Sequence, residues 1–144
     1  MSVLSDPLGF FTLQVAEGWT SETEDCVTTL KGPLGAGVLY VSGGRRAGGP
    51  EAGFGGAEFL GRFLRSIGVE VSESAILCSQ GVGCRIYSYL RDTDDSHWRY
   101  WSVTDEETAL LISYTCHLRD AGREEDDVDA MLRSVRLYHS ARMH

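Results

Sequence analysis

Aromatic and guanidinium side chains gather in one part of the chain, in two neighbouring stretches that predict strands. Residues 97–103 read HWRYWSV, and residues 84–92 read CRIYSYLRD. Tyrosine, tryptophan and arginine are enriched at the energetic centres of protein interfaces, because each joins a large contact area to a directional polar group. Their abundance here predicts a surface that binds another protein.

Alternation along a strand divides these side chains between two faces. If Arg91 pairs with Trp98, and Val103 pairs with Ala109 in the next hairpin, one face collects most of the aromatic groups, while the face of Trp101 belongs to the core. The predicted partner surface comprises Tyr87, Tyr89, Arg91, Trp98, Tyr100 and Tyr114. The alternative is that a helix covers this face and makes it core as well. In that case we expect the end flanked by arginine to stay more exposed.

A glycine-rich stretch, residues 43–56, precedes a predicted helix and carries Arg45 and Arg46. Amide and guanidinium groups before a helix can hold a phosphate, but the residue order of a phosphate-binding loop is missing. The simpler interpretation is a connecting loop. We add Arg45 and Arg46 to the predicted partner surface. The alternative function is a small-ligand-binding protein or enzyme whose pocket lies between this loop and the sheet edge.

Other reactive side chains give weak support for catalysis. Cys116 and His117 are adjacent, so on a strand they point to opposite faces and cannot form a thiolate–imidazole pair. His97, His117 and Asp95 could approach one another in the proposed register, yet no histidines or cysteines have the spacing of metal ligands. The sequence also lacks a G-x-S-x-G nucleophile elbow. We therefore expect no enzyme activity, no metal and no cofactor.

Apolar periodicity predicts the elements that must position these residues. Strands are predicted over residues 9–16, 26–32, 37–43, 71–80, 84–92, 97–103 and 109–118. The first three are expected to form one antiparallel meander and the last four a second. Helical spacing predicts helices over residues 57–68 and 122–138. This order predicts a single α+β domain over residues 1–144, with a largely antiparallel sheet of about six to seven strands and helices packed on its faces.

The composition is that of an acidic globular protein. The net charge is −8, and Lys31 is the only lysine among 13 basic residues. This charge argues against nucleic acid as a partner, and the composition does not suggest a membrane span. Residues 1–11, MSVLSDPLGFF, lack the features of an export signal. The four cysteines show no C-x-x-C spacing, so we expect buried thiols in a reducing compartment. We expect a cytoplasmic protein, and the scarcity of lysine beside 17 glycines favours a GC-rich, bacterial source.

Four apolar segments carry a resemblance to a known family. The chain resembles the PsbP-like α/β/α sandwich family, relatives of PsbP, the Ran-binding Mog protein and DcrB, in residues 11–30 (FTLQVAEGWTSETEDCVTTL), 37–43 (GVLYVSG), 111–116 (LISYTC) and 128–137 (VDAMLRSVRL). The resemblance implies an α/β/α sandwich that acts by binding other proteins, and it transfers no functional residue. We therefore expect a non-catalytic protein-binding module of the adaptor, chaperone or immunity type. Homodimerisation through the same face is a further alternative.

Overall fold

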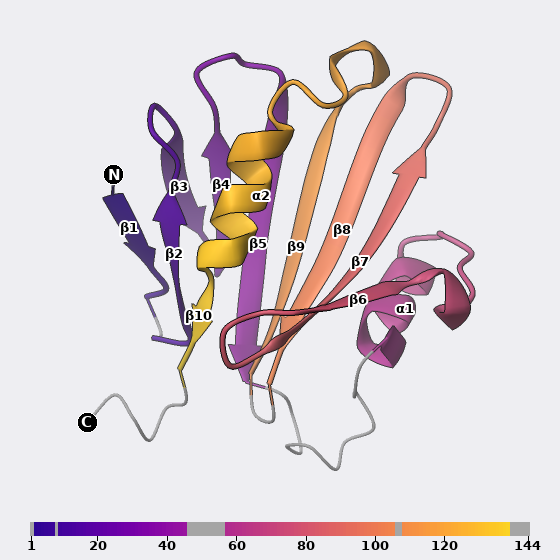
Figure 1. The fold of residues 1–144 in the computed structure, drawn as a ribbon, viewed down its shortest axis with the longest axis horizontal. Coiled ribbons are helices and arrows are strands. Elements are labelled where there is room, and N and C mark those ends of the chain that lie inside the picture. The colour runs from indigo at the N-terminus through magenta and orange to yellow at the C-terminus, as the bar shows by residue number, and fades with distance from the viewer. Residues whose placement is uncertain (1, 8, 46–56, 106–107, 139–144) are drawn as a thin grey trace.

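The computed structural model describes residues 2–7, 9–45, 57–105 and 108–138, and Figure 1 shows how its elements are arranged. Within these residues, the larger sheet contains β3 (Thr20–Glu24), β4 (Val27–Lys31), β5 (Gly37–Arg45), β6 (Leu77–Gln80), β7 (Arg85–Asp92), β8 (Ser96–Thr104) and β9 (Thr108–His117). The smaller sheet contains β1 (Ser2–Ser5), β2 (Phe11–Val15) and β10 (Arg136–Leu137). The helices are α1 (Ala57–Ser66), α2 (Glu125–Ser134) and the short 3₁₀ helices η2 (Glu73–Ala75) and η3 (Leu118–Asp120).

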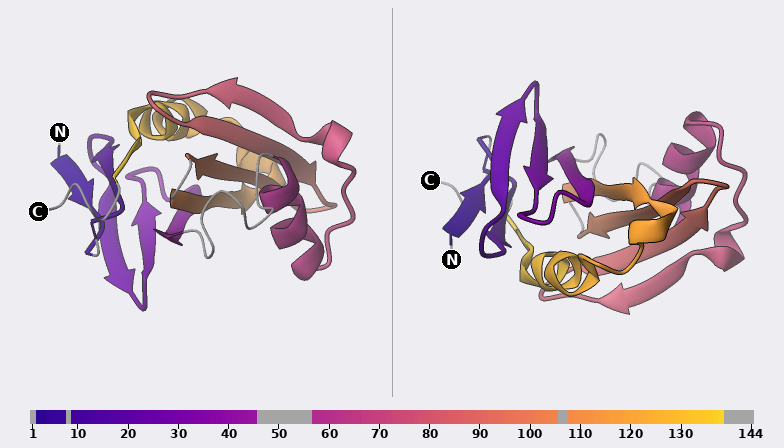
Figure 2. Two further views of the ribbon diagram at one scale, coloured as in Figure 1. Left: turned by 90° about the horizontal axis from the view of Figure 1, so that it is seen from below. Right: turned by 90° about the horizontal axis from the view of Figure 1, so that it is seen from above.

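The larger sheet is antiparallel throughout, with the strand order β3-β4-β5-β9-β8-β7-β6. The four strands from β6 to β9 are neighbours in sequence order, as predicted for the second meander. The two α-helices pack on opposite faces of this sheet, α2 together with the smaller sheet on one face and α1 on the other (Figure 2). The predicted α+β fold, with helices on the faces of a largely antiparallel sheet, is confirmed.

The larger core lies between the sheet, α2 and β2. Along α2, apolar residues at positions three and four apart form one buried face of Val128, Met131 and Leu132. They belong to the same buried cluster as Leu39 of β5 and Leu13 of β2, both fully buried. Each such side chain contributes about 1.5–3 kcal/mol by leaving water. The acidic first turn and basic last turn of α2 also match the helix macrodipole.

A smaller core lies on the other face of the sheet, beneath α1. Leu60 and Leu64, four residues apart on α1, are fully buried. They share a cluster with Ile76, with Tyr87 of β7 and with Tyr100 of β8. The helix that covers part of the aromatic face is therefore α1.

The predicted arrangement of the first three strands is wrong for the first of them. β2 does not join the meander but lies between β1 and β10 in the smaller sheet, where Phe11 pairs with Leu137. Its buried residues alternate as expected of a strand, but they face α2 rather than a neighbouring hairpin. The meander is completed instead by β3, whose five residues are all exposed. Without alternating apolar residues, β3 gives no strand signal.

The predicted register is confirmed between β7 and β8 and wrong between β8 and β9. Arg91 pairs with Trp98 as expected, but Val103 pairs with Leu110 instead of Ala109. The second hairpin closes where the amide of Asp105 donates to the carbonyl of Thr108, 3.0 Å away, so its strands are longer than predicted. A shift of one residue moves every β9 side chain to the other face.

Two further properties concern the length of the helices and the state of the cysteines. None of the helices in the described ranges is long and apolar enough to cross a membrane. All four cysteines are free thiols; Cys84 and Cys116 are buried, while Cys26 and Cys78 are exposed. The buried pair lies in the larger core, consistent with thiols used for packing. The expectation of buried thiols is wrong for Cys26 and Cys78.

Candidate functional site

The aromatic face is divided by α1 into a buried part and a partly exposed part. Tyr87 and Tyr100 are only 7% and 3% exposed, because α1 packs on them. Tyr89 and Trp98 pack against the same cluster but, like Arg91, remain partly exposed. We call these three residues the aromatic rim. Of the predicted partner surface on β7 and β8, these three residues are more exposed than Tyr87 and Tyr100.

The rings at the aromatic rim are held in a fixed arrangement. Trp98 stacks on Tyr100 with the ring planes 2° apart and the centroids 5.8 Å apart. Phe63 of α1 approaches the same tyrosine edge-on, with a centroid distance of 6.4 Å. Burial raises the pKa of Tyr100 above its usual value, and a hydrogen bond from Arg91 partly offsets this effect. The rim residues are therefore positioned by rigid strands and by ring stacking before any partner arrives.

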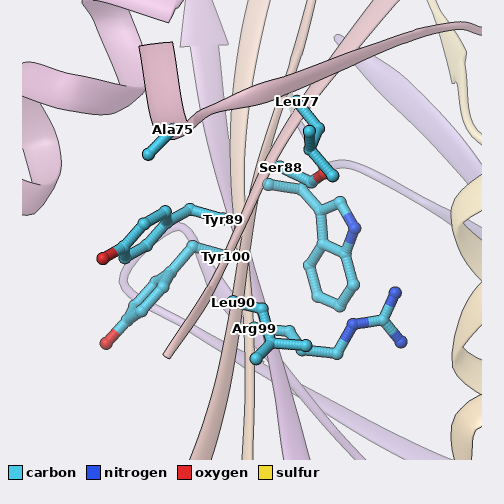
Figure 3. Close-up of a pocket in the computed structure, with 8 residues that line it drawn as sticks. Ala75, Leu77, Ser88, Tyr89, Leu90, Arg99 and Tyr100 are labelled. Atoms are coloured by element: carbon cyan, nitrogen blue, oxygen red, sulfur yellow. The ribbon is translucent and has the colours of Figure 1, made fainter. Parts of the chain in front are cut away.

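A cavity of about 290 Å³ opens beside the rim, at the edge of the sheet where β6 begins at Leu77 (Figure 3). Its walls are Ala75, Leu77, Ser88, Tyr89, Leu90, Arg99, Tyr100 and Trp101. Figure 3 shows the rings of Tyr89 and Tyr100 on one side of the strands, and Leu77 and Arg99 on the other. The cavity thus reaches both faces of the sheet around the edge of β7.

The charged wall of the cavity is tied to α2. Nη2 of Arg99 donates to Oδ1 of Asp129 at 2.9 Å, and the guanidinium carbon lies 4.6 Å from the centre of the Trp101 ring. A guanidinium above an aromatic ring gains a cation–π attraction in addition to its ion pair. Arg99 therefore holds β8 to α2 and forms a fixed side of the cavity.

The register shift removes Tyr114 from the predicted partner surface. Tyr114 lies in the larger core, where its hydroxyl donates to Oε1 of Glu124 at 2.6 Å. Burial raises the pKa of Tyr114 well above its usual value, and the neighbouring carboxylate adds to the shift. Glu124 is itself only 3% exposed, and its Oε2 has no hydrogen-bond partner within the described residues. Nothing in the local sequence around Glu124 marks its side chain as buried.

Comparison with known proteins identifies the fold that carries this site. No protein-family model and no curated protein matches the sequence. The solution structure of cyanobacterial PsbP (CyanoP) from Synechocystis sp. PCC 6803 matches with a TM-score of 0.67 and 12% identity, over 95% of this chain and 92% of that protein. The chain has the PsbP-like fold.

The PsbP-like fold also occurs within a longer protein. A crystal structure of a protein from Bacteroides thetaiotaomicron VPI-5482 matches with a TM-score of 0.68 and 10% identity. The match covers 96% of this chain but 49% of the Bacteroides protein, so this chain spans about half the length of that protein. Likeness at such low identity concerns the fold and leaves the site to be argued from its own geometry.

The remaining predicted residues lie away from the aromatic rim or outside the described residues. Arg45 ends β5, where its backbone pairs with Thr108. Arg46 lies outside the described residues, as do residues 47–56, so the predicted ligand pocket beside the glycine-rich loop falls there as well. The cavity at β7 is lined by other parts of the PsbP-like fold.

His97 and His117 lie on opposite faces of the larger sheet. His97 pairs with Cys116, and His117 pairs with Ser96, so the same register shift that moves Tyr114 also separates these two imidazoles. Nδ1 of His97 lies 2.6 Å from Oδ1 of Asp92. Within the part of the chain that the structure describes, no group of three histidine, cysteine, aspartate or glutamate residues could hold a metal ion. The expected approach of His97 and His117 is therefore wrong.

Proposed function

We propose that this protein is a non-catalytic protein-binding module, and that it binds its partner through the aromatic rim and the adjacent cavity. The observation that carries the proposal is the partial exposure of Tyr89, Arg91 and Trp98 beside a cavity of about 290 Å³. A face of this composition would be expected to be buried fully if it served packing alone. Tyr87 and Tyr100 are buried against α1, whereas the three rim residues are buried only in part.

Preorganisation is the physical reason that such a surface can bind well. Ordering a flexible side chain in an interface costs about 0.5–1.5 kcal/mol. Trp98 is already stacked on Tyr100, so less of this cost remains to be met when a partner binds. Residues of these types supply most hot-spot energy in protein interfaces.

The lining of the cavity favours binding over acid–base catalysis. Its eight residues include no aspartate, glutamate, histidine, cysteine or lysine. The one cation, Arg99, is engaged by Asp129. General acid–base catalysis requires a titratable group within hydrogen-bond reach of the substrate, and among the lining residues the phenols of Tyr89 and Tyr100 are the groups that could serve it. We therefore favour a binding role for this cavity.

The proposal places the protein in the cytoplasm of a bacterium, with another protein as its partner. The four free thiols suit a reducing compartment. The net charge of −8 favours a protein partner over nucleic acid. An adaptor, a chaperone and an immunity protein are all consistent with such a module.

A double variant tests this function directly. Tyr89→Ala combined with Arg91→Ala removes two rim residues, and truncating hot-spot residues of these types costs about 2 kcal/mol or more each. Tyr40→Ala is the matched control, because Tyr40 is a 38% exposed tyrosine on β5, outside the rim and the cavity lining. Variants and wild type with equal melting temperatures are used to capture proteins from a lysate of the native host.

The expected result is a stoichiometric partner that wild type and Tyr40→Ala retain and the double variant loses. Retention of the same partner by all three proteins would exclude the aromatic rim as its binding surface. If wild type retains no stoichiometric partner, the protein-binding function itself is contradicted.

The cavity supports a second candidate function, the binding of a small molecule. Ligand pockets have volumes of about 300–1,000 Å³, and this cavity lies near the lower end of that range. A metabolite that raises the melting temperature of wild type, but not that of Tyr89→Ala, would favour this function.

A further inference from the structure

The outer edge of β7 is covered along only half of its length. β6 pairs with residues from Arg85 to Ser88, and the ladder then stops. The other half, from Tyr89 to Asp92, pairs with β8 on its inner side. No strand within the described ranges pairs with these four residues on the outer side. A partly uncovered edge offers backbone hydrogen-bonding groups to another strand.

The two hairpins of β7 determine which backbone groups face this open edge. The amide of Gly81 bonds the carbonyl of Cys84, and the amide of Thr93 bonds the carbonyl of Ser96. Because antiparallel ladders alternate, odd-numbered residues of β7 bond to β8 and even-numbered residues point to the outer edge. The amide and carbonyl groups of Leu90 and Asp92 therefore face outward, beyond the end of β6.

The chain turns away from this edge where β6 could have continued. Leu77 pairs with Ser88, so an extended β6 would place Ile76 opposite Tyr89 and Ala75 opposite Leu90. Instead, residues 73–75 form the 3₁₀ helix η2, and Ile76 is buried in the smaller core. The cavity occupies the position that an extended β6 would have filled, between Ala75 and the edge of β7.

We propose that an extended segment of the partner protein binds here as an additional strand, antiparallel to β7 and in line with β6. This inference rests on the proposed protein-binding function and specifies how the partner is held. Main-chain hydrogen bonds to Leu90 and Asp92 supply affinity, and the cavity and the aromatic rim select the side chains.

The edge prescribes the side chains of the bound segment. The residue opposite Leu90 points to the side of Arg99 and Trp101, where Leu90 and Leu77 are 56% and 70% exposed. An apolar side chain there fills the cavity and covers both leucines. The residue opposite Arg91 lies on the aromatic face, where an acidic side chain pairs with the guanidinium. Because the strands are antiparallel, the segment carries an acidic residue followed directly by an apolar one.

A second copy of this chain fits the edge poorly. A twofold pairing that uses Leu90 and Asp92 of both copies places Arg91 directly opposite Arg91. Like charges opposite each other destabilise a strand pair. A pairing centred on Leu90 would require the backbone of Ser88, which Leu77 already occupies. The occupant is therefore a segment of a different protein.

A synthetic peptide tests the strand geometry without relying on a protein variant. The probe is fluorescently labelled Thr-Thr-Val-Glu-Leu-Val, in which glutamate meets Arg91 and leucine meets Leu90. The matched control carries an N-methyl group on that leucine, which removes one backbone donor and keeps every side chain. Fluorescence anisotropy with the full protein should show that methylation weakens binding by about tenfold or more. Equal binding of the two peptides, or binding of neither, would overturn the proposal.

A second test changes the edge itself. Leu90→Pro removes the outward amide while leaving the ladder to β8 intact, and proline is tolerated on edge strands. Leu90→Thr is the control, because it also removes the leucine side chain but keeps the amide. We expect the probe to bind Leu90→Pro about tenfold more weakly than Leu90→Thr. Equal affinities would assign the peptide to a side-chain surface rather than to a strand.

The outcomes separate this inference from the proposed function. If Tyr89→Ala/Arg91→Ala loses the captured partner while Leu90→Pro retains it, the strand addition is wrong and the binding module stands. A protein that elutes as a dimer, and that Leu90→Pro converts to a monomer, would assign the edge to a second copy and overturn the inference.

Discussion

At the scale of single residues, Tyr89 and Tyr114 of the larger sheet lie in different environments. Tyr89 lies at the open end of its face, whereas Tyr114 is buried with its hydroxyl on Glu124. That hydrogen bond satisfies one oxygen of a carboxylate that is almost wholly enclosed. A buried carboxylate that loses its donor is strongly destabilising, because the charge is then left without compensation.

The Tyr114–Glu124 contact makes stability sensitive to alkaline pH. In the folded protein the pKa of Tyr114 is raised above 10.0, mainly by burial. Burial of the neutral phenol therefore contributes to the free energy of unfolding fully below about pH 10. This contribution is lost as the pH rises further, by up to about 1.4 kcal/mol per pH unit. Tyr114→Phe should reduce this slope in urea unfolding between about pH 9 and pH 11. An unchanged slope would exclude Tyr114 as its source.

The same variant should also be less stable at neutral pH. Without the hydroxyl, Glu124 has lost its donor, which costs about 1–3 kcal/mol. Tyr40→Phe is the control, since Tyr40 is a 38% exposed tyrosine on β5. A loss of equal size in both variants would show that the Glu124 contact is not responsible.

At the scale of elements, the β3–β4 hairpin is closed by a turn of unusual composition. Asp25 and Cys26 have φ angles of 50° and 66°, in the left-handed region that favours glycine or asparagine. Two-residue hairpins with both residues in this region prefer asparagine followed by glycine. Aspartate, like asparagine, tolerates this region, so the conformational cost of the turn falls on Cys26 and is about 1–2 kcal/mol.

Replacement of Cys26 by glycine should stabilise the protein. Glycine adopts a positive φ without steric cost, so we expect a gain of about 1 kcal/mol, or about 2–4 °C in Tm. Cys78→Gly provides the contrast, because Cys78 is an exposed thiol within β6, where glycine weakens a strand. Thermal unfolding measures both, and a lower Tm for Cys26→Gly would contradict the argument.

Local patterns predicted the elements better than the pairings between them. Both helices and six of the strands in the larger sheet follow from apolar spacing, as does the β7–β8 register with Arg91 opposite Trp98. The β8–β9 register does not, because β9 carries large apolar residues on both faces at Leu110, Leu111 and Ile112. Either register then buries apolar groups, and the choice depends on where the hairpin closes.

The candidate site could be predicted only in part, because local patterns indicate the rim but not the cavity. The partial exposure of the rim follows from the β7–β8 register and the position of α1. The cavity could not be predicted in this way, because it depends on η2, which turns the chain away from the edge of β7 before Leu77. This turn accompanies the burial of Ile76 in the smaller core. That burial is a long-range contact, and the spacing of apolar residues within residues 71–80 does not reveal it.

At the scale of the whole molecule, one sheet separates two cores. The larger core contains α2 and the smaller sheet, while the smaller core contains α1. Adjacent residues of the same strands point into both, as with Tyr100 and Trp101 of β8. Neither core can therefore lose its packing without disturbing strands that the other requires.

This shared sheet predicts a single cooperative transition. Leu64→Ala creates a cavity in the smaller core and should cost about 2–5 kcal/mol. The loss should appear equally in hydrogen exchange of β2, which lies in the larger core, and in far-ultraviolet circular dichroism. If β2 retained its full protection in this variant, the single domain predicted over residues 1–144 would have to be divided.

The pairing of β2 with β10 determines when β2 can fold during synthesis of the chain. The ribosome makes β2 long before β10, and the amide of Gln14 finds its acceptor on Ser134, 120 positions later. Until α2 and Leu137 have emerged, Phe11 and Leu13 lack the surfaces that bury them. During translation they are exposed to water or to a chaperone that shields nascent chains. β2 is thus made before β10 but cannot reach its final place until β10 has been made.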